Sequence, residues 1–306
     1  MRVLVTGGAG FIGSNLALRL AAEGHDVIAA DTFRHAHWTN LVRFTGDVLT
    51  LLDPLDVAAM AALGPYDVIF HQASITDTTV SDQQEMLRSN VEQFRRLLDM
   101  AVETKARVVW ASSCSIYGQG PVPMKEDQAP DPLNVYAFSK LVMERMAARY
   151  APRLAKPIVA LRYSNVYGPG EDHKGKFASM IHQLASQMRA GRRPRIFEHG
   201  EQKRDFVYVD DVVELNVRAM EAREPGVFNA GAGASWTFNE VVAELNGVLD
   251  TNLEPDYFPN PYSFTQDWTQ TDLSRSREVL GYQPRFDLQR GIEAYHATGR
   301  LGVPVG

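Results

Sequence analysis

Short apolar runs alternate with amphipathic segments along the first half of the chain. The apolar runs are rich in β-branched residues, as expected of strands buried on both faces of a parallel sheet. We predict strands at residues 2–6, 26–30, 68–71, 108–112 and 158–162. We predict helices between them at residues 14–23, 55–63, 86–103 and 135–150. This alternation predicts an α/β fold of the Rossmann type, with a doubly wound parallel sheet.

The pattern changes near residue 165. Residues 168–175 are polar and rich in turn formers, which predicts a loop. Further helices are predicted at residues 177–190, 209–221, 237–249, 274–280 and 288–298. We expect a dinucleotide-binding domain over residues 1–165, rejoined by about 205–228, and a smaller C-terminal α/β substrate-binding domain mainly over 166–306. No flexible linker separates the two, so we expect them to pack together and enclose a cleft.

The composition narrows the possible partners. The chain has 306 residues with 37 acidic and 31 basic side chains, a net charge of -6. Such a chain has no general attraction to nucleic acids or anionic membranes, so an anionic ligand must meet a local basic site. Cys114 is the only cysteine, which excludes an internal disulfide and a thiolate zinc cluster. We therefore expect a cytoplasmic protein without a metal site.

Glycines at positions 7, 10 and 13 follow the first predicted strand and precede a helix. In this context Gly7, Gly10 and Gly13 allow a tight turn, close approach of the backbone to a pyrophosphate, and close packing of helix on sheet. Asp31 ends the second strand 24 residues after Gly7, where a carboxylate can bind ribose hydroxyls. The alternative is a glycine-rich turn without a ligand, which this strand and helix context disfavours.

The second strand also bears on the choice of cofactor. Asp31 favours NAD because its charge would repel a 2′-phosphate, whereas Arg34 favours NADP if it pairs with that phosphate. A solvated arginine is the simpler interpretation of Arg34, so we predict NAD and leave NADP open. Further residues predicted to bind the cofactor are Phe11, Ile12, Asp47, Val48, Gln72, Ala73, Ser74 and Asn90.

Tyr136 and Lys140 are one turn apart on a predicted helix, so they share a face. A nearby ammonium favours the phenolate, which lets a tyrosine take a proton from a sugar hydroxyl near neutral pH. This spacing is common by chance, but Ser113 supports the hypothesis because it ends a strand, where open α/β sheets place their sites. Cys114 is interpreted as a small buried residue, since no His and Asp pair is evident to activate it.

Together these motifs resemble the extended short-chain dehydrogenase/reductase family of nucleotide-sugar epimerases and dehydratases. The segments that carry the resemblance are residues 6–13, Asp31, Ser113, Tyr136 with Lys140, 162–169 and 204–211. The resemblance implies a bound nicotinamide cofactor, a tyrosine base with its lysine, and a nucleotide-diphosphate sugar as substrate. It also implies a homodimer or larger homo-oligomer, because family members usually pair through two helices of the cofactor domain.

Within the family, the chain is most similar to the branch that epimerises C6″ of ADP-linked heptoses. The similarity lies in residues 132–136, 165–169, 173–175 and 203–209. It implies that Lys174 is a second catalytic base opposite Tyr136; the alternative is an ordinary loop lysine. The expected substrate contacts are Ser113, Asn165, Lys174, Lys176 and Arg204, with Arg204 best suited to a diphosphate.

Two positions separate the reactions of the family. The 4,6-dehydratases resemble Thr-Asp-Glu where this chain has Ser113, Cys114 and Ser115, so elimination loses its carboxyl pair and epimerisation is favoured. A UDP-hexose 4-epimerase-like activity or another nucleotide-sugar oxidoreductase is the alternative among enzymes. A non-catalytic dinucleotide-binding sensor is the alternative of another class, and the intact Tyr136 and Lys140 disfavour it.

Overall fold

The computed structural model describes residues 1–77, 82–259 and 266–304. Its main sheet has seven strands in the order β11-β6-β5-β4-β1-β2-β3, and each neighbouring pair is parallel. The strands are β1 (Arg2–Thr6), β2 (Asp26–Asp31), β3 (Asp47–Thr50), β4 (Val68–His71), β5 (Arg107–Ser113), β6 (Ile158–Tyr163) and β11 (Gly226–Ala230). The five predicted strands are all present. The two that the sequence analysis missed, β3 and β11, form the edges of the sheet.

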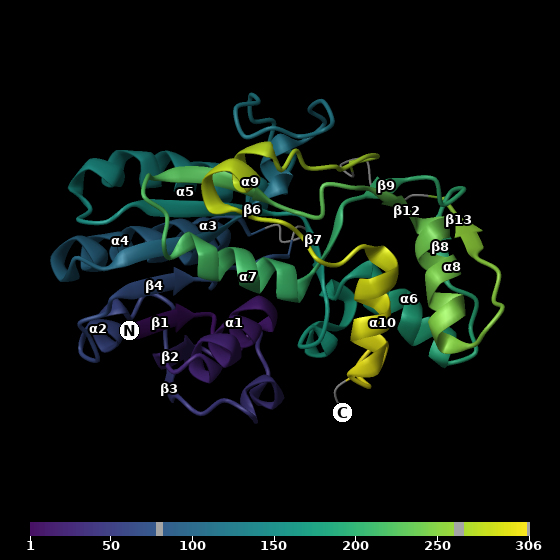
Figure 1. Ribbon diagram of the computed structural model, residues 1–306, viewed down its shortest axis with the longest axis horizontal. Helices are drawn as coiled ribbons and strands as arrows, with labels where there is room; N and C mark the ends of the chain where they lie inside the picture. Colours follow the sequence, from purple (N-terminus) through teal and green to yellow (C-terminus); the bar gives the residue numbers. More distant parts are fainter. Residues whose placement is uncertain (78–81, 260–265, 305–306) are drawn as a thin grey trace.

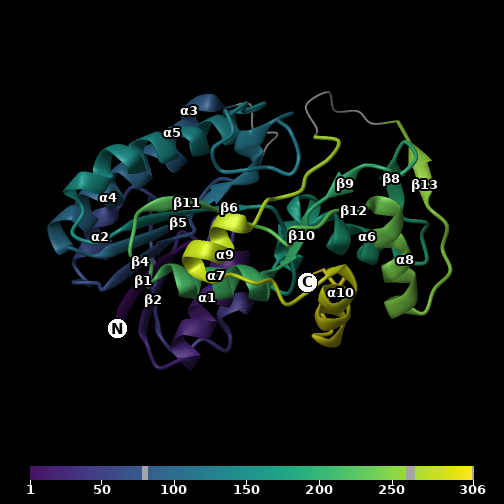
Figure 2. The same ribbon diagram turned by 45° about the horizontal axis from the view of Figure 1, so that its top comes forward.

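Helices cover both faces of this sheet, as Figure 2 shows. Alternate residues of a strand point to opposite faces, so in β1 Val3 and Val5 join one hydrophobic cluster and Leu4 joins another. The first cluster includes α1 (Phe11–Ala22), α7 (Val209–Ala219) and α9 (Ser274–Leu280); the second includes α2 (Val57–Ala61), α4 (Gln93–Thr104) and α5 (Val135–Tyr150). The expected Rossmann-type α/β fold is confirmed.

One predicted helix is interrupted. The segment expected as a single helix at 86–103 consists of α3 (Gln83–Leu87), a π-helical turn η2 (Arg88–Glu92) and α4. Asn90 lies in that turn, where its buried side chain accepts a hydrogen bond from the Ile75 amide at 2.8 Å and donates to Ser139 Oγ at 3.1 Å. The turn therefore fixes the chain after β4 against α5.

The remaining helices surround a third hydrophobic cluster, in the right-hand part of Figure 1. They are α6 (Met180–Arg189), α8 (Phe238–Leu249) and α10 (Leu288–Ala297). Three pairs of short strands, which the sequence analysis did not predict, accompany them: β7 (Asn165–Tyr167) with β10 (Phe206–Tyr208), β9 (Lys203–Arg204) with β12 (Trp236–Thr237), and β8 (Arg195–Phe197) with β13 (Asp256–Phe258). The proposed domain limits stay a prediction.

The chain passes more than once between the main sheet and the part around the third hydrophobic cluster. It leaves the main sheet after β6, returns through α7 and β11, and pairs β11 with β6 in parallel. In the described residues, no helix is both long and apolar enough to cross a membrane.

Candidate active site

The turn after β1 has the form that a pyrophosphate-binding turn requires. Gly7 has φ +67°, and a Cβ there would lie 2.7 Å from the backbone nitrogen of Ala73. A Cβ on Gly13 would lie 2.1 Å from the Gly7 carbonyl oxygen. Gly10 precedes α1, whose first turn has no side-chain cap. The positive end of a twelve-residue helix therefore faces the turn without a side-chain cap. Phe11 and Ile12 begin this helix, and their contact with the cofactor stays a prediction.

Asp31 ties the end of β2 to this turn. Its carboxylate accepts hydrogen bonds from the Ala9 amide at 3.0 Å and the Phe33 amide at 2.9 Å. Burial raises the pKa of Asp31, and these amides oppose that shift. The exposed Arg34 guanidinium donates to the Leu52 carbonyl at 3.0 Å. Asp31 thus lies beside the glycine turn, whereas Arg34 contacts the backbone that follows the edge strand.

The segment after β4 lies directly beside the turn. Ala73 meets Gly7 through its backbone, while Ser74 Oγ donates to the Ile75 carbonyl at 3.3 Å. Gln72 accepts a hydrogen bond from the Tyr163 hydroxyl at 2.9 Å and donates to Asn216 at 3.1 Å. The side chain of Gln72 thereby joins β4 to β6 and α7.

Tyr136 lies in the first turn of α5, and a buried lysine follows it by one turn. The cap of this helix is Asn134, which accepts a hydrogen bond from the Ala137 amide at 2.8 Å. Lys140 is 1% exposed, and its Nζ donates to the Ala111 carbonyl of β5 at 2.8 Å. The same Nζ lies 5.7 Å from the centre of the Tyr136 ring. Tyrosine and lysine are thus held together at the carboxyl end of β5.

Burial acts against the charged forms of both side chains. It lowers the pKa of Lys140 to about 7, and it raises the pKa of Tyr136. A hydrogen bond with Ser113 opposes the rise in the pKa of Tyr136. Ser113 Oγ also accepts from the Ser115 amide at 3.1 Å, which orients the serine at the end of its strand. Burial therefore favours the neutral phenol, and the phenolate needs positive charge close to it.

Four of the predicted residues line one cavity of about 270 Å³: Ser113, Tyr136, Asn165 and Arg204. They come from β5, α5, β7 and β9, so the fold brings together residues that are distant in sequence. The other lining residues are Cys114, Ser115, Leu133, Asn134, Tyr163, Ser164, Gln266 and Thr269. Gln266 and Thr269 belong to an irregular segment without a motif, so no sequence signal pointed to them.

Arg204 supplies positive charge to this cavity. Its guanidinium donates to the backbone carbonyls of Lys203 at 2.9 Å and Asp267 at 3.2 Å. Burial lowers its pKa to about 10. Among the residues that the structure describes, it forms no ion pair with a carboxylate, and the Asp267 carboxylate is the acidic group that raises its pKa. Such a group suits an anionic substrate.

Other predicted residues do not line the cavity. Lys174 is partly buried with its Nζ 5.8 Å from the centre of the Phe11 ring, and burial lowers its pKa. Lys176 is exposed, with its Nζ 4.9 Å from the Phe177 ring. Asp47 and Val48 are exposed on the edge strand β3. Lys174 thus lies beside the start of α1, and its catalytic role stays a prediction.

The single cysteine does not have the environment of a nucleophile. Cys114 is buried, its Sγ donates to the Arg162 carbonyl at 3.3 Å, and burial raises the pKa of the thiol well above its usual value. No cluster of three metal-ligating side chains is found in the described parts of the chain.

Comparison with known proteins agrees with this geometry. The model of the NAD dependent epimerase/dehydratase family matches residues 3–231. An ADP-L-glycero-D-manno-heptose-6-epimerase of Alkalilimnicola ehrlichii is 36% identical, and the match covers 96% of each chain. The protein of the same name from Brachyspira hyodysenteriae is 35% identical, also over 96% of each chain.

Solved structures show the same fold. The ADP-L-glycero-D-manno-heptose-6-epimerase of Helicobacter pylori is 38% identical with a TM-score of 0.91, covering 97% of this chain and 95% of that one. The UDP-glucose 4-epimerase of Thermotoga maritima, solved with UDP-glucose, is 29% identical with a TM-score of 0.92, covering 98% and 99%. The UDP-glucuronic acid 4-epimerase of Bacillus cereus, solved with UDP-glucuronic acid and NAD, is 28% identical with a TM-score of 0.86, covering 97% and 98%.

Fold and site thus define a Rossmann-type enzyme with a tyrosine and lysine pair at the carboxyl end of strand β5. The chain belongs to the NAD dependent epimerase/dehydratase family. The expectation of an NAD-dependent enzyme of the epimerase class is confirmed by this membership.

The close contact within the glycine turn gives a direct test of the dinucleotide site. We expect Gly13→Ala to abolish NAD binding and to destabilise the protein by about 1–3 kcal/mol, because the added methyl group overlaps the Gly7 carbonyl. Calorimetric titration with NAD and thermal unfolding measure the two effects. The matched control is Gly247→Ala in α8, which has open space around it and should stabilise the helix by about 0.5–1 kcal/mol without changing NAD affinity. Normal NAD binding by Gly13→Ala would refute the assigned site.

Proposed function

We propose that this enzyme epimerises a nucleotide-diphosphate sugar, and that the sugar is an ADP-linked heptose inverted at C6″. The observation that carries the proposal is one cavity that combines Ser113 and Tyr136 with the guanidinium of Arg204. The first two suit proton transfer at a sugar hydroxyl, and the third suits a diphosphate. Similarity over nearly the whole chain to three heptose-6-epimerases supports the choice of sugar.

Epimerisation fits the residues between Ser113 and Tyr117 better than elimination does. Loss of water from a sugar needs a general acid and a general base near the reacting carbons. Cys114 keeps its proton because of its burial, and Ser115 is a hydroxyl with no hydrogen-bond partner for its buried Oγ. Neither side chain carries a carboxyl group into the cavity.

The residues of the turn fit NAD. Gly7, Gly10 and Gly13 leave room for a pyrophosphate at the start of α1, and Asp31 suits the ribose hydroxyls. NAD held here would supply reversible hydride transfer at the sugar carbon, and its oxidised ring would add positive charge to the site. Arg34 already donates to a backbone carbonyl, which supports NAD rather than NADP.

The chain's own residues handle the proton. Tyr136 Oη takes the proton of the reacting hydroxyl when the sugar is oxidised, and a second group delivers a proton to that oxygen when the ketone is reduced from its other face. Proton exchange with solvent then returns both groups to their starting states. Ser113 Oγ orients the oxygen through a hydrogen bond. Lys140 stabilises the phenolate with its buried ammonium, which remains anchored to the Ala111 carbonyl. Asn165 and Arg204 hold the nucleotide part while the ketone turns its second face toward the cofactor.

We assign Lys174 the role of the second proton-transfer group. The two faces of one carbon need groups on opposite sides, and Tyr136 supplies only one of them. Burial lowers the pKa of Lys174, which brings its ammonium closer to the range in which it exchanges protons. Its position beside Phe11, at the start of α1, keeps it near the expected cofactor.

Replacing the tyrosine tests the reaction itself. We expect Tyr136→Phe to lower kcat by about 10²–10⁴-fold with ADP-heptose, since it removes the proton acceptor, while NAD remains bound. The measurements are epimer ratio by NMR and absorbance near 340 nm for transiently reduced cofactor. If the wild-type protein turns over only UDP-hexoses, the proposed ADP-heptose substrate is wrong. If it turns over no nucleotide sugar, the result favours a non-catalytic dinucleotide-binding sensor.

A lysine pair tests the second group. We expect Lys174→Met to slow epimerisation of ADP-heptose by at least about 100-fold, because general acid–base groups contribute on that scale. The control is Lys105→Met, which removes an exposed lysine at the end of α4 that has no predicted role in the site. Equal rates for wild type and Lys174→Met would refute the proposal that Lys174 is the second proton-transfer group.

We further propose that two copies pair through an apolar surface between α3, η2 and α5. It is lined by Gln84, Leu87, Arg88, Val91, Glu92, Phe138 and Val142. Phe138 is 42% exposed there, although it belongs to the same helix as Tyr136. The resemblance to the family implies pairing through two helices of the cofactor domain, which supports a second copy as the occupant.

Light scattering after size-exclusion chromatography tests this pairing. We expect Phe138→Asp to give monomers, because a charge would be buried at the centre of the interface. The control is Val279→Asp, which places the same charge on an exposed apolar position of α9 and should leave the dimer intact. A monomeric wild-type protein would refute the proposed pairing.

A further inference from the structure

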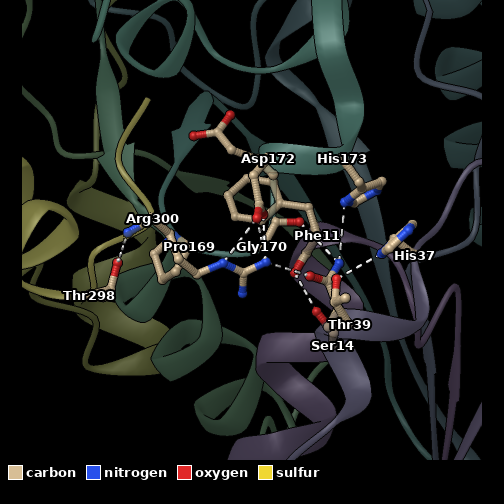
Figure 3. A network of polar contacts seen from close by, with 12 residues as sticks. Phe11, Ser14, His37, Thr39, Pro169, Gly170, Asp172, His173, Thr298 and Arg300 are labelled. Carbon is tan, nitrogen blue, oxygen red and sulfur yellow. Dashed lines mark hydrogen bonds and ion pairs between the residues drawn. The ribbon is translucent and has the colours of Figure 1, made fainter. Parts of the chain in front are cut away.

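Three segments that are distant in sequence meet beside the glycine turn. They are the 3₁₀ helix η1 (Trp38–Leu41), the segment that contains η5 (Asp172–Phe177), and the residues that follow α10. Figure 3 shows Arg300 reaching from the C-terminal part toward Asp172, with Phe11, Gly170 and His173 close by. None of the roles assigned above uses Arg300, Asp172 or the buried Asn40.

Arg300 and Asp172 form a two-pronged ion pair. Arg300 Nη2 lies 2.6 Å from Asp172 Oδ1, and its Nε lies 3.1 Å from Oδ2. The Asp172 side chain is 8% exposed and that of Arg300 33% exposed. Arg300 is presented by a fixed stretch of chain, because Leu301 is fully buried and its carbonyl accepts from Arg189 at 2.7 Å. The pair therefore has the planar geometry that arginine makes with carboxylates.

Asn40 connects this ion pair to the glycine turn. Its Oδ1 accepts from Arg300 Nη2 at 3.1 Å. Its Nδ2 donates to the Ala9 carbonyl in the turn and to the Gly170 carbonyl, each at 3.1 Å. It also lies 3.3 Å from His173 Nδ1. One buried amide, 5% exposed, thus links the cofactor turn, the 170–173 segment and the C-terminal arginine.

The same segment is fixed on its other side by Glu171. This buried carboxyl group accepts hydrogen bonds from the Gly168 amide at 3.0 Å and from Ser179 Oγ at 2.9 Å. Burial raises the pKa of Glu171 to about 7. The residues immediately before Lys174 are therefore held individually, and the lysine follows them with its Nζ beside Phe11.

We propose that Arg300, Asp172 and Asn40 are positioning residues that hold Lys174 in place relative to the glycine turn. This inference rests on the catalytic role proposed for Lys174. Arg300 neutralises Asp172, which lies two residues before the lysine. Without Arg300, a buried carboxylate is left unpaired and the segment that carries Lys174 loses its link to Arg300 and, through Arg300, one link to Asn40, so the lysine is no longer held beside Phe11. A group displaced by about 1 Å loses roughly 100-fold in rate, even when the substrate still binds.

Steady-state kinetics test the role of Arg300. We expect Arg300→Met to lower kcat for ADP-heptose by about 10–100-fold while KM changes less than about twofold, and Arg300→Lys to recover part of the loss. In a Lys174→Met background, Arg300→Met should cause no further loss, because it acts through the lysine. A full additional loss in that background, or equal changes in kcat and KM, would overturn the proposal.

Hydrogen exchange provides a readout that needs no substrate. We expect Arg300→Met to speed amide exchange in residues 5–15 and 168–178 of the NAD-bound protein. The control is Arg285→Met, which removes another arginine–aspartate pair. Arg285 Nε lies 3.6 Å from Asp211 Oδ1, and both residues are distant in sequence from the two segments. Unchanged exchange in both segments would refute the positioning role even if the enzyme is active. If exchange rises but wild type turns over no nucleotide sugar, the proposed function fails and the link between the segments stands.

Discussion

The buried ammonium of Lys140 ties the helix that carries Tyr136 to the strand that carries Ser113 in the candidate active site. A charge with 1% exposure must find polar partners, and the Ala111 carbonyl at 2.8 Å is the one that the structure provides. That bond joins the first turns of α5 to the end of β5, two residues before Ser113. It therefore fixes the position of Tyr136 relative to both the serine and the sheet. Burial lowers the pKa of Lys140 to about 7, so the charge of this lysine responds to charged groups that bind nearby.

Much of this arrangement could be predicted because it depends on local patterns. Continuous apolar runs identified the five central strands, and the glycines identified the turn between β1 and α1. Tyr136 and Lys140 share a helix face at any helix orientation, so their proximity followed from spacing alone. The cavity was harder, since Ser113, Asn165 and Arg204 meet only after three separate segments have packed.

The features that were missed have specific physical causes. Strand β3 lies at the sheet edge with three of its four residues exposed, so it lacks the apolar run of a buried strand. The π-helical turn around Asn90 is set by tertiary hydrogen bonds to Ile75 and Ser139, which leave no trace in periodicity. The roles of Asn40 and Arg300 depend on contacts across 260 positions of the chain, and no local motif reports those.

The site also divides according to how its parts are supported. Ser113 lies at the carboxyl end of β5 in the main sheet and Tyr136 on α5 beside it, whereas Asn165 and Arg204 lie on short strands joined through buried Asp205. The Asp205 carboxylate accepts hydrogen bonds from the Ala232 amide at 2.7 Å and the Thr271 amide at 2.9 Å, so it gathers the segments around the cavity. The cavity therefore has one wall fixed to the main sheet and another that depends on the packing of the outer segments. Solved structures with TM-scores of 0.86 to 0.92 bear the names of epimerases of different nucleotide sugars, so this fold is compatible with more than one sugar.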